Sequence, residues 1–360
     1  MNRKKSTLSK VFNLIVRSQI GPLLALAVIV AGFAIADSVW GRGSFLSLRN
    51  ARVLTSTASL IAVPALGMTL VIIAGGIDLS AGTALSLCGT VLATQLKFSE
   101  TTNDQAGFAG AIAVTVLLTI LTGCCCGLFN GGLISLTRVV PFIVTLGTMT
   151  IFLGIGQIVA DESTVYAPPQ HQPQWLQNLC YTGPKAEKYE WIAYVPTNAI
   201  LAVILAVLVG LLLRYTVFGR NIFALGSSES TARLCGINVP LTIVSVYTLA
   251  GVFVALGGVL YFADVKNGNP SDGLGVELEI IAAVVLGGGS LSGGRGSVLG
   301  TMIGALIIVV IRNGCGLLEI PDTYTHIIIG CIIIVAVILD NLRHGTPEWF
   351  FRLMPKPVQD

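Results

Sequence analysis

Long apolar segments separated by short polar ones run from about residue 20 to residue 341. An α-helix needs about 20 consecutive, mostly apolar residues to cross the hydrocarbon core of a bilayer. The pattern therefore predicts about ten spanning helices, near 20–38, 55–75, 79–96, 108–134, 140–160, 192–213, 240–262, 278–290, 297–312 and 325–340. The eighth segment is short, and glycines interrupt the fourth. The expected fold class is an all-α polytopic membrane protein.

The composition supports this fold class. Charged residues make up 11% of the chain and hydrophobic residues 54%, whereas an average soluble domain has about 25% charged residues. The mean hydropathy is +0.83. A soluble protein of this length needs more polar side chains to cover its surface. Much of the surface is therefore expected to face a lipid bilayer. The net charge of +3 gives no reason to expect a nucleic-acid partner.

The distribution of basic residues predicts how the chain is oriented. The segment 1–19 carries Arg3, Lys4, Lys5, Lys10 and Arg17. Basic segments stay on the cytoplasmic side, so an even number of spans places both this segment and the tail 342–360 in the cytoplasm. The membrane domain is then 20–341, with an external loop at 161–191 and a cytoplasmic loop at 214–239. Segment 41–52 disagrees, because it should be external yet carries three arginines. An interfacial helix there would explain them.

The external loop is the one long polar stretch between spans. Its prolines and amides exclude a further span, and the sequence leaves open whether it docks an external partner or only connects two helices. Cys180 and Cys315 both fall in external segments, and whether they pair is also open. The eight cysteines show no C-x-x-C spacing and no histidine nearby, so no metal site is expected.

Glycines four residues apart recur on two of the predicted helices. In lipid, small residues at this spacing allow two helix backbones to approach closely. The sequence therefore predicts helix packing faces at Gly123, Gly127 and Gly131 in the fourth span, and at Gly296, Gly300 and Gly304 in the ninth.

Catalytic signatures of soluble enzymes are absent from the sequence. No Gly-Lys dipeptide occurs, so there is no Walker A loop for ATP, and neither H-E-x-x-H nor G-x-S-x-G is found. Asp78 is the one carboxylate predicted to lie closely between apolar segments. Ion-coupled carriers usually need several intramembrane ionisable groups. A single Asp beside Ser80 is better suited to a neutral polar solute.

The segment that contains Asp78 has an echo in the second half of the chain. "GGIDLSAG" (75–82) matches "GGGSLSGG" (287–294) at five of eight positions. Glycine-interrupted segments at corresponding places in two halves point to a binding path, because broken helices are tolerated only where they line a cavity or are buried in protein. A chance echo of two simple turns remains the alternative. The candidate path or hinge residues are Gly75, Gly76, Asp78, Ser80, Gly82, Gly287, Gly288 and Ser292.

A short helix is predicted in the cytoplasmic loop after Ser227. Ser227 or Ser228 serves as the N-cap and Gly236 as the C-cap. Glu229 near the start and Arg233 near the end complement the helix dipole. A helix of about two turns is not stable alone in water, so it is either a surface linker or a handle for a soluble partner.

Four blocks resemble the membrane permease subunits of bacterial ATP-binding-cassette importers for monosaccharides, of the ribose, galactose and xylose type. They are "GMTLVIIAGGIDLSAG" (67–82), "GRNIFALGSSESTARLCGINV" (219–239), "IAAVVLGGGSLSGGRGSVLGTMIGAL" (281–306) and "NGCGLL" (313–318). The similarity extends from about residue 20 to 341, and the ribose permease type looks most similar.

The resemblance implies a set of partners. Such permeases sit in the bacterial inner membrane and pair with a second permease copy. ATP and Mg²⁺ are bound by separate ATP-binding subunits, so no cofactor is expected on this chain, and a soluble sugar-binding protein delivers the substrate. The residues implied in coupling to the ATPase are Arg220, Gly226, Ser228, Glu229, Ala232, Arg233 and Gly236. The family usually has Asn where Ser228 stands here, and the triple cysteine at 124–126 is unusual.

A second hypothesis is a single-chain secondary carrier or facilitator for a neutral polar solute. The polytopic pattern and the echo between the halves fit it, whereas the single intramembrane Asp and the four family blocks favour the importer.

Overall fold

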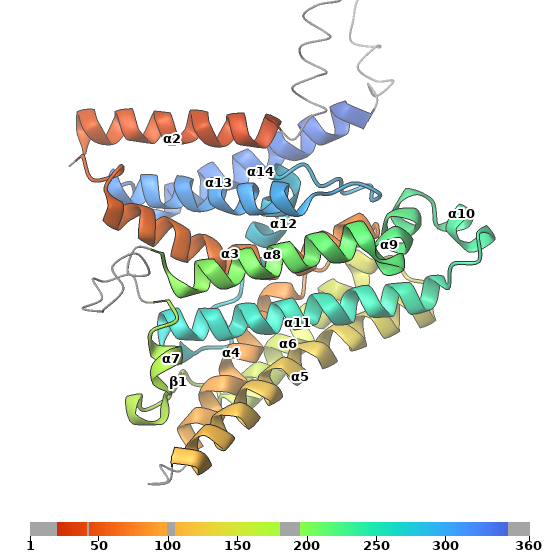
Figure 1. Ribbon diagram of the computed structural model, residues 1–360, viewed down its shortest axis with the longest axis horizontal. Coiled ribbons are helices and arrows are strands. Elements are labelled where there is room, and N and C mark those ends of the chain that lie inside the picture. Colours follow the sequence, from red (N-terminus) through yellow and green to blue (C-terminus); the bar gives the residue numbers. More distant parts are fainter. Residues whose placement is uncertain (1–19, 42, 99–104, 181–194, 345–360) are drawn as a thin grey trace, which may run out of the picture.

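The computed structural model describes residues 20–41, 43–98, 105–180 and 195–344 of the 360-residue chain. The predicted cytoplasmic segment 1–19, and all but the first three residues of the predicted tail, lie outside the described residues. Helices account for most of the described chain (Figure 1). The principal helices are α2 (Ile20–Trp40), α3 (Leu48–Ile73), α4 (Ala81–Phe98), α5 (Gln105–Thr137), α6 (Pro141–Val159), α8 (Thr197–Tyr215), α11 (Val239–Val265), α13 (Val298–Leu317) and α14 (Asp322–His344).

Shorter elements lie between these helices. They are β1 (Val165–Tyr166), η1 (Pro169–His171), α7 (Gln174–Gln177), α9 (Val217–Ser227), α10 (Glu229–Leu234), β2 (Asn267–Gly268) and α12 (Val276–Leu286). In Figure 1 the labels α7 and β1 lie at one end of the bundle, and α10 projects beyond the opposite end. The two ends that the charge pattern distinguishes are thus separated by the length of the bundle.

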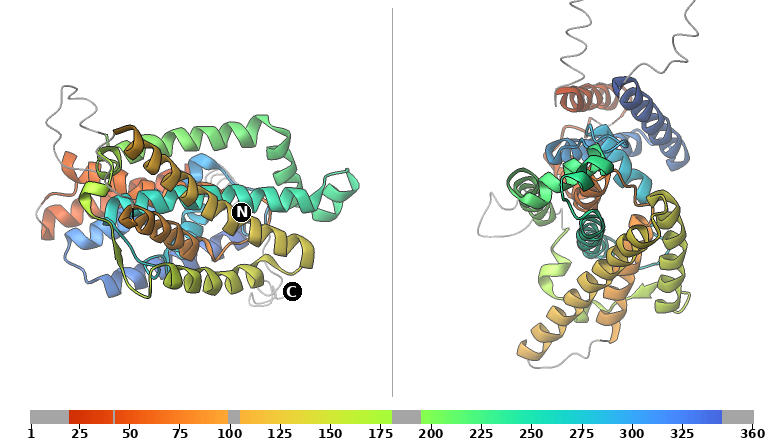
Figure 2. Two further views of the ribbon diagram at one scale, coloured as in Figure 1. Left: turned by 90° about the horizontal axis from the view of Figure 1, so that it is seen from below. Right: turned by 90° about the vertical axis from the view of Figure 1, so that its right-hand side faces the viewer.

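Helix α3 forms the centre of the bundle. In its most apolar 18-residue window 89% of the residues are buried inside the protein, against 6% in the corresponding window of α2. Seen end-on, α2 and α14 lie on one side of the bundle and α4, α5 and α6 on the other (Figure 2, right). The exposed apolar side chains of α2, such as Leu24, Val28 and Ile35, suit a lipid environment.

Seven helices are long and apolar enough to cross a membrane within the described residues. They are α2, α3, α5 (from Ala111), α6, α8, α11 and α13. The ten predicted spans also include α4, α12 and α14. The predicted eighth segment, already short at 278–290, corresponds to α12, which has 11 residues. Its length of about 16 Å is half of the roughly 30 Å hydrocarbon core, so it does not cross the core alone.

The predicted interfacial helix at 41–52 is also wrong. Helix α3 begins at Leu48 with the Ser47 hydroxyl accepting from the Asn50 amide, so Arg49 and Arg52 belong to the first turns of α3. Arg42 lies outside the described residues. The Ser47 cap explains the difference. It starts α3 at Leu48, several residues before the apolar segment predicted at 55–75, so the two arginines fall within the spanning helix.

The α5–α11 pair shows what the first glycine face does. A Cβ atom on Gly123 would meet the Gly251 carbonyl oxygen of α11, and one on Gly127 would meet the Tyr247 carbonyl oxygen. On Gly131 it would lie 2.9 Å from the Val244 Cα. The three glycines therefore hold the two backbones in direct contact, the arrangement that small residues permit in lipid.

The second glycine face is divided between a helix and a loop. Gly300 packs on Gly287, the residue that caps α12, and Gly304 packs on Ala283 within α12. Gly296 precedes α13, which begins at Val298, and faces the Ile73 side chain instead. The prediction of three glycines on one helix face is therefore wrong for Gly296.

The described part of the segment predicted to be an external loop folds back onto the bundle. Strands β1 and β2 pair antiparallel, with Val165 opposite Gly268, and Leu176 is 1% exposed. Cys180 and Cys315 are both free and lie in separate apolar clusters. The two cysteines are therefore not paired with each other in this structure, and each is a buried free thiol. Residues 181–191 of the predicted loop lie outside the described residues.

Candidate functional site

The first glycine-rich segment is a break between two helices. Helix α3 ends at Ile73 and α4 begins at Ala81. Gly75 has φ +85°, a conformation that an L side chain rarely adopts. A Cβ on Gly76 would lie 2.5 Å from the Tyr247 hydroxyl. Both glycines are required by the local geometry, one by its dihedral angle and the other by the close approach of α11.

Asp78 and Ser80 form a buried hydrogen-bond network within this break. One Asp78 carboxylate oxygen accepts from the Ser80 amide at 2.9 Å and from the Ser80 hydroxyl at 2.6 Å. The Asn130 amide nitrogen donates to the Ser80 hydroxyl at 2.7 Å. Asp78 is 6% exposed and Ser80 1%. Because Asp78, Ser80 and Asn130 already bond to one another, these side chains are better placed to hold the break in shape than to bind a passing solute.

The carbonyl of Ile77 anchors the same break to two further helices. The Thr145 hydroxyl of α6 donates to it at 3.1 Å, and the Tyr247 hydroxyl of α11 at 3.4 Å. Sequence reasoning missed Asn130, Thr145 and Tyr247. An Asn inside an apolar span was a visible signal, whereas Thr and Tyr are too common in such spans to stand out.

The second glycine-rich segment is also a break, between α12 (ending at Leu286) and α13. Gly288, Gly293 and Gly294 all have positive φ angles, and the Ser290 amide donates to the Arg295 carbonyl at 3.1 Å. The echo of the two sequences thus corresponds to two irregular segments that join helices.

The two breaks meet each other and the end of α9. The Gly294 amide donates to the Ile73 carbonyl at 2.8 Å. A Cβ on Gly293 would lie 2.9 Å from the Gly75 Cα, and a Cβ on Gly226 would collide with the Ile73 carbonyl oxygen. We call Gly75, Gly226, Gly293 and Gly294 the glycine junction. Three segments distant in sequence cross here with only backbone between them.

Helix α10 follows the glycine junction directly. The Ser228 hydroxyl accepts from the Thr231 amide at 3.3 Å as the N-cap, and Gly236 closes the helix with φ +80°. Glu229 and Arg233 form an ion pair at 2.5 Å on its exposed surface. The predicted capped helix is present, with Ser228 rather than Ser227 as the cap. Ala232 is 2% exposed, while Leu234 is 89% exposed. One face of α10 therefore packs against the protein, and the last residue of the helix projects into the surroundings.

Arg220 lies on α9, the helix that leads into the glycine junction. Thr216 caps this helix by accepting from the Gly219 amide at 3.0 Å, and Ile222 is fully buried. Arg220 itself is exposed, so α9 is fixed by its apolar face and presents its one basic side chain outward.

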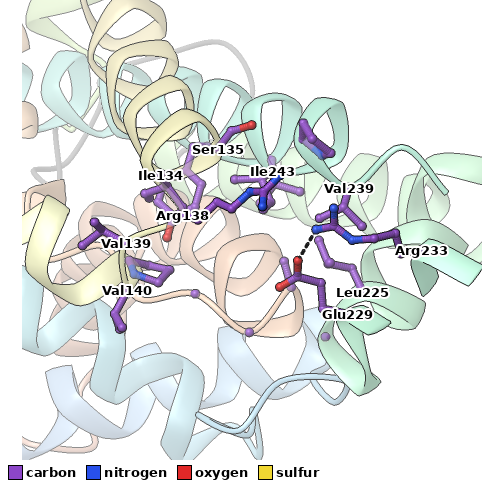
Figure 3. A pocket seen from close by; sticks show the side chains of 18 of the residues that line it. Ile134, Ser135, Arg138, Val139, Val140, Leu225, Glu229, Arg233, Val239 and Ile243 are labelled. Carbon is purple, nitrogen blue, oxygen red and sulfur yellow. Dashed lines mark hydrogen bonds and ion pairs between the residues drawn. The ribbon is translucent and has the colours of Figure 1, made fainter. Parts of the chain in front are cut away.

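A cavity of about 460 Å³ lies beside α10 and the glycine junction (Figure 3). Its wall comes from the first break, the end of α5, α10, α11 and the second break, through residues that include Gly75, Gly76, Arg138, Gly226, Glu229, Arg233, Ile243, Tyr247 and Ser292. Of the predicted path residues, Asp78, Ser80, Gly82, Gly287 and Gly288 do not line it. The structure therefore brings some of the residues predicted for coupling and some of those predicted for the path together at one cavity.

Gly82 belongs to a different contact. A Cβ there would collide with the Gly273 carbonyl oxygen and the Glu277 carboxylate. The segment between β2 and α12 thus lies against the start of α4, with Ser86 of α4 donating to the Pro270 carbonyl at 2.8 Å.

The structure corrects the list of charged groups among the helices. Glu277 and Glu279 of α12 are 5% and 8% exposed, and Glu279 forms an ion pair with Arg312 of α13. The prediction of Asp78 as the one carboxylate closely surrounded by apolar segments is therefore wrong. The predicted span at 278–290 leaves Glu277 outside, although α12 starts one residue before it. Glu279 lies inside that predicted span and is overlooked by the sequence interpretation.

Within the described ranges, no group of three His, Cys, Asp or Glu side chains is arranged to hold a metal ion. What the geometry offers is instead a mechanical connection. An exposed helix is joined through bare backbone to two breaks, beside a cavity that it helps to line.

Comparison with known proteins gives the family. A family model described as the permease component of branched-chain amino acid transport systems matches residues 50–337. The chain belongs to this family. The ribose import permease of Bacillus subtilis is 34% identical to it over 329 residues, which cover 91% of this chain and 94% of the relative.

Two further relatives of this permease family come from Escherichia coli K12. The galactose/methyl galactoside import permease is 35% identical over 307 residues, covering 84% of this chain and 89% of the relative. A probable ABC transporter permease is 34% identical over 325 residues, covering 90% of each chain. No solved structure matches the chain.

Proposed function

We propose that this chain is the transmembrane permease subunit of an ATP-binding-cassette importer that moves a monosaccharide, of ribose-like size, across the bacterial inner membrane. The observation that carries the proposal is the similarity, over nearly the whole length, to import permeases named for ribose and for galactose. The family description names branched-chain amino acids, and these are the competing substrate class.

The geometry supports a division of labour between this chain and its partners. ATP and Mg²⁺ are bound by separate ATP-binding subunits that grip α10 from the cytoplasm, and a soluble sugar-binding protein delivers the substrate outside. Two permease copies pair around the path. Closure of the ATP-binding subunits moves α9 and α10 as one body, a rigid-body transition of the hinge type.

The glycine junction supports the transfer of this movement to the path. Gly226 has no side chain between it and Ile73 or Gly294, so a displacement of α9 reaches both breaks without passing through a flexible contact. Close-packed contacts of this kind have discrete arrangements and do not deform continuously. The cavity beside α10 then opens toward the cytoplasm in one arrangement and closes in the other.

The proposed topology keeps both termini cytoplasmic and about ten membrane segments, with α12 as an incomplete one. The basic residues of 1–19 support this orientation. So does the projection of α10 from the end of the bundle opposite β1 and α7 (Figure 1).

Co-purification tests the proposal directly. The tagged chain is extracted gently from its native membrane, and the co-purifying chains are identified by mass spectrometry. A stoichiometric partner with a Walker A loop is the expected result. Uptake is then measured over a panel of monosaccharides with leucine and isoleucine beside them. Uptake of the amino acids alone would overturn the substrate class and leave the importer in place.

Charge reversal on α10 tests the proposed coupling role. Glu229 and Arg233 are exposed and pair only with each other among the described residues, and an exposed pair of this kind stabilises a protein by less than about 1 kcal/mol. Glu229→Lys and Arg233→Glu are therefore expected to leave the protein folded and to abolish ATP-dependent uptake. Normal uptake in both variants would contradict the assignment of α10 as the helix that couples the permease to the ATP-binding subunits.

The secondary carrier is the second candidate. It predicts a homo-oligomer without an ATPase and a proton- or Na⁺-dependent current that Asp78→Asn abolishes. The hydrogen bonds from Ser80 and Asn130 to Asp78 weigh against it, because a coupling carboxylate has to exchange its partners during transport.

A further inference from the structure

A second large hollow lies on the outer surface of the bundle, away from the cavity beside α10. It is a groove of about 710 Å³ between α8, α9 and the start of α13. Apolar side chains form most of its wall, among them Val203, Val207, Leu213, Phe223, Leu299 and Met302. Helix α8 stands at the edge of the bundle (Figure 2, left), so the groove opens toward the surrounding bilayer.

The groove has the length of one lipid leaflet. Along α8 its wall extends from Val203 to Arg214, eleven residues apart, which is about 16 Å at the rise of an α-helix. Half of the hydrocarbon core is about 15 Å thick. Val203 and Leu299 are 56% and 57% exposed, so these apolar walls require an apolar occupant.

Positive charge lies at one end of this apolar groove. Arg214 lines it there, with its guanidinium carbon 5.6 Å from the centre of the exposed Tyr215 ring. From Thr197 to Ser228 the sequence contains no Asp or Glu. The N-terminus of α13, with Ser297 and Val298, lines the groove as well, and the positive end of a helix dipole favours anions.

We propose that this groove binds a phospholipid with an anionic head group. Its acyl chain lies between α8 and α13, and its phosphate lies at Arg214 and the N-terminus of α13. An apolar chain of leaflet length that ends in a negative charge matches both properties of the groove. A soluble phosphate would satisfy Arg214 but would leave the apolar wall uncovered. The binding does not depend on the proposed transport function; only its placement in the cytoplasmic leaflet rests on the proposed orientation.

The bound lipid would join the helix that leads into the coupling segment to the helix that follows the second break. Phe223 belongs to α9, three residues before Gly226 of the glycine junction, and Leu299 and Met302 belong to α13. The lipid is thus placed to stabilise one arrangement of α9 relative to the bundle.

Filling the groove tests the acyl-chain part of the proposal. Gly210 lines the groove, and a Cβ there would meet nothing within 4 Å, so Gly210→Phe occupies the space without a backbone clash. Gly147→Phe on α6 is the matched control, because a Cβ at Gly147 also meets nothing within 4 Å and Gly147 does not line the groove. Each full-length protein is purified in detergent and titrated with phosphatidylglycerol, and bound lipid is counted by native mass spectrometry.

The expected result is loss of one tightly bound phosphatidylglycerol in Gly210→Phe and its retention in Gly147→Phe. Both variants are first shown to elute as single species of the wild-type size. Equal retention in both would overturn the proposal. A loss of dimer in Gly210→Phe would also overturn it and would identify the groove as an interface between two copies.

Removal of the charge tests the head-group part. Arg214→Gln is expected to weaken phosphatidylglycerol binding about fivefold, from roughly 1 kcal/mol per basic residue near a charged lipid surface. Phosphatidylethanolamine binding should change little. Arg138→Gln removes an exposed arginine that lines the other cavity and serves as the charge-matched control. An equal effect of both variants, or equal affinity of wild type for the two lipids, would contradict a head-group site at Arg214.

Discussion

At the scale of single residues, burial decides the chemistry of the cysteines. Cys180 is 7% exposed, its thiol donates to the Leu260 carbonyl at 3.4 Å, and burial raises its pKa from an ordinary 9.0 to about 12. Near neutral pH it then has about a thousandfold less thiolate than an ordinary cysteine, and the thiolate is the nucleophile. Cys235, at the C-cap of α10, is exposed.

A maleimide reagent should therefore label Cys235 readily in the folded protein and Cys180 only after denaturation. The modified residues are identified by peptide mass spectrometry. Equal labelling of the two thiols in the folded state would contradict the burial of Cys180, and a requirement for reductant before Cys180 reacts would contradict its free thiol.

Gly226 gives a second prediction at this scale. Gly226→Ala places a methyl group onto the Ile73 carbonyl oxygen, and overpacking of this kind typically costs about 1–3 kcal/mol. We expect a lower melting temperature in detergent and a loss of uptake. Gly132→Ala is the matched control, because a Cβ at Gly132 meets nothing within 4 Å. A Gly226→Ala variant with wild-type stability and uptake would show that the three segments do not cross as described.

The residues that could be predicted from the sequence are those that act locally. Ser228 caps a helix that starts at the next residue, and Gly236 ends it, so both functions are visible in a few letters. Asn130 acts on Ser80 across 50 positions, and Tyr247 acts on Ile77 across 170. Such contacts depend on which helices become neighbours, and one sequence does not contain that information.

At the scale of the helices, hydropathy predicted the long elements but not the incomplete ones. Helix α3 and helix α11, with 26 and 27 residues, are each longer than the hydrocarbon core is thick and have apolar runs that mark them clearly. Helix α12 has only 11 residues, and its apolar run continues through glycines, so hydropathy placed the short eighth segment at 278–290, later in the chain than the helix. This shift leaves Glu277 outside the predicted segment, although α12 includes it.

The ion pair between α12 and α13 makes a prediction at this scale. The Glu279 side chain is 11% exposed and the Arg312 side chain 41%, so the pair is only partly buried. Removal of one partner should therefore cost more than the loss of an exposed pair, about 1 kcal/mol at most, and less than the roughly 3 kcal/mol typical of a fully buried pair. Glu279→Gln should therefore lower the melting temperature clearly, and Glu279→Gln with Arg312→Gln should recover part of the loss. Glu229→Gln breaks the exposed pair with Arg233 and should have little effect on stability. Equal melting temperatures of Glu279→Gln and Glu229→Gln would contradict the burial of the Glu279 carboxylate between α12 and α13.

At the scale of the whole molecule, the arrangement of the helices separates two functional ends. Helix α10 and the cavity lie at one end, whereas β1, β2 and α7 lie at the other (Figure 1). The sequence predicted this polarity through its charge pattern, because basic residues record the side on which a segment stays. It did not predict that both breaks would meet α9 at the end of the bundle that carries α10.

Accessibility from the two sides of the membrane tests this polarity. In intact cells an impermeant maleimide should label a cysteine introduced by Gln174→Cys, at an exposed position in α7. It should label Cys235 only after the membrane is permeabilised. Each site is measured in a background with the other exposed cysteines replaced by serine. Labelling of Cys235 in intact cells would invert the proposed topology.

The glycine junction also limits which second-site mutations can restore function. At Gly226 the obstacle to any larger residue is a carbonyl oxygen of the main chain, and no substitution elsewhere in the gene removes a main-chain atom. A defect caused by Gly226→Ala should therefore yield no compensating change of one neighbouring side chain in a suppressor screen, only reversion to glycine. Gly132 and Gly210 face open space, so larger residues can replace them without a backbone clash. Substitutions at such positions can change which lipids or partners the chain binds, while the glycine junction stays unchanged.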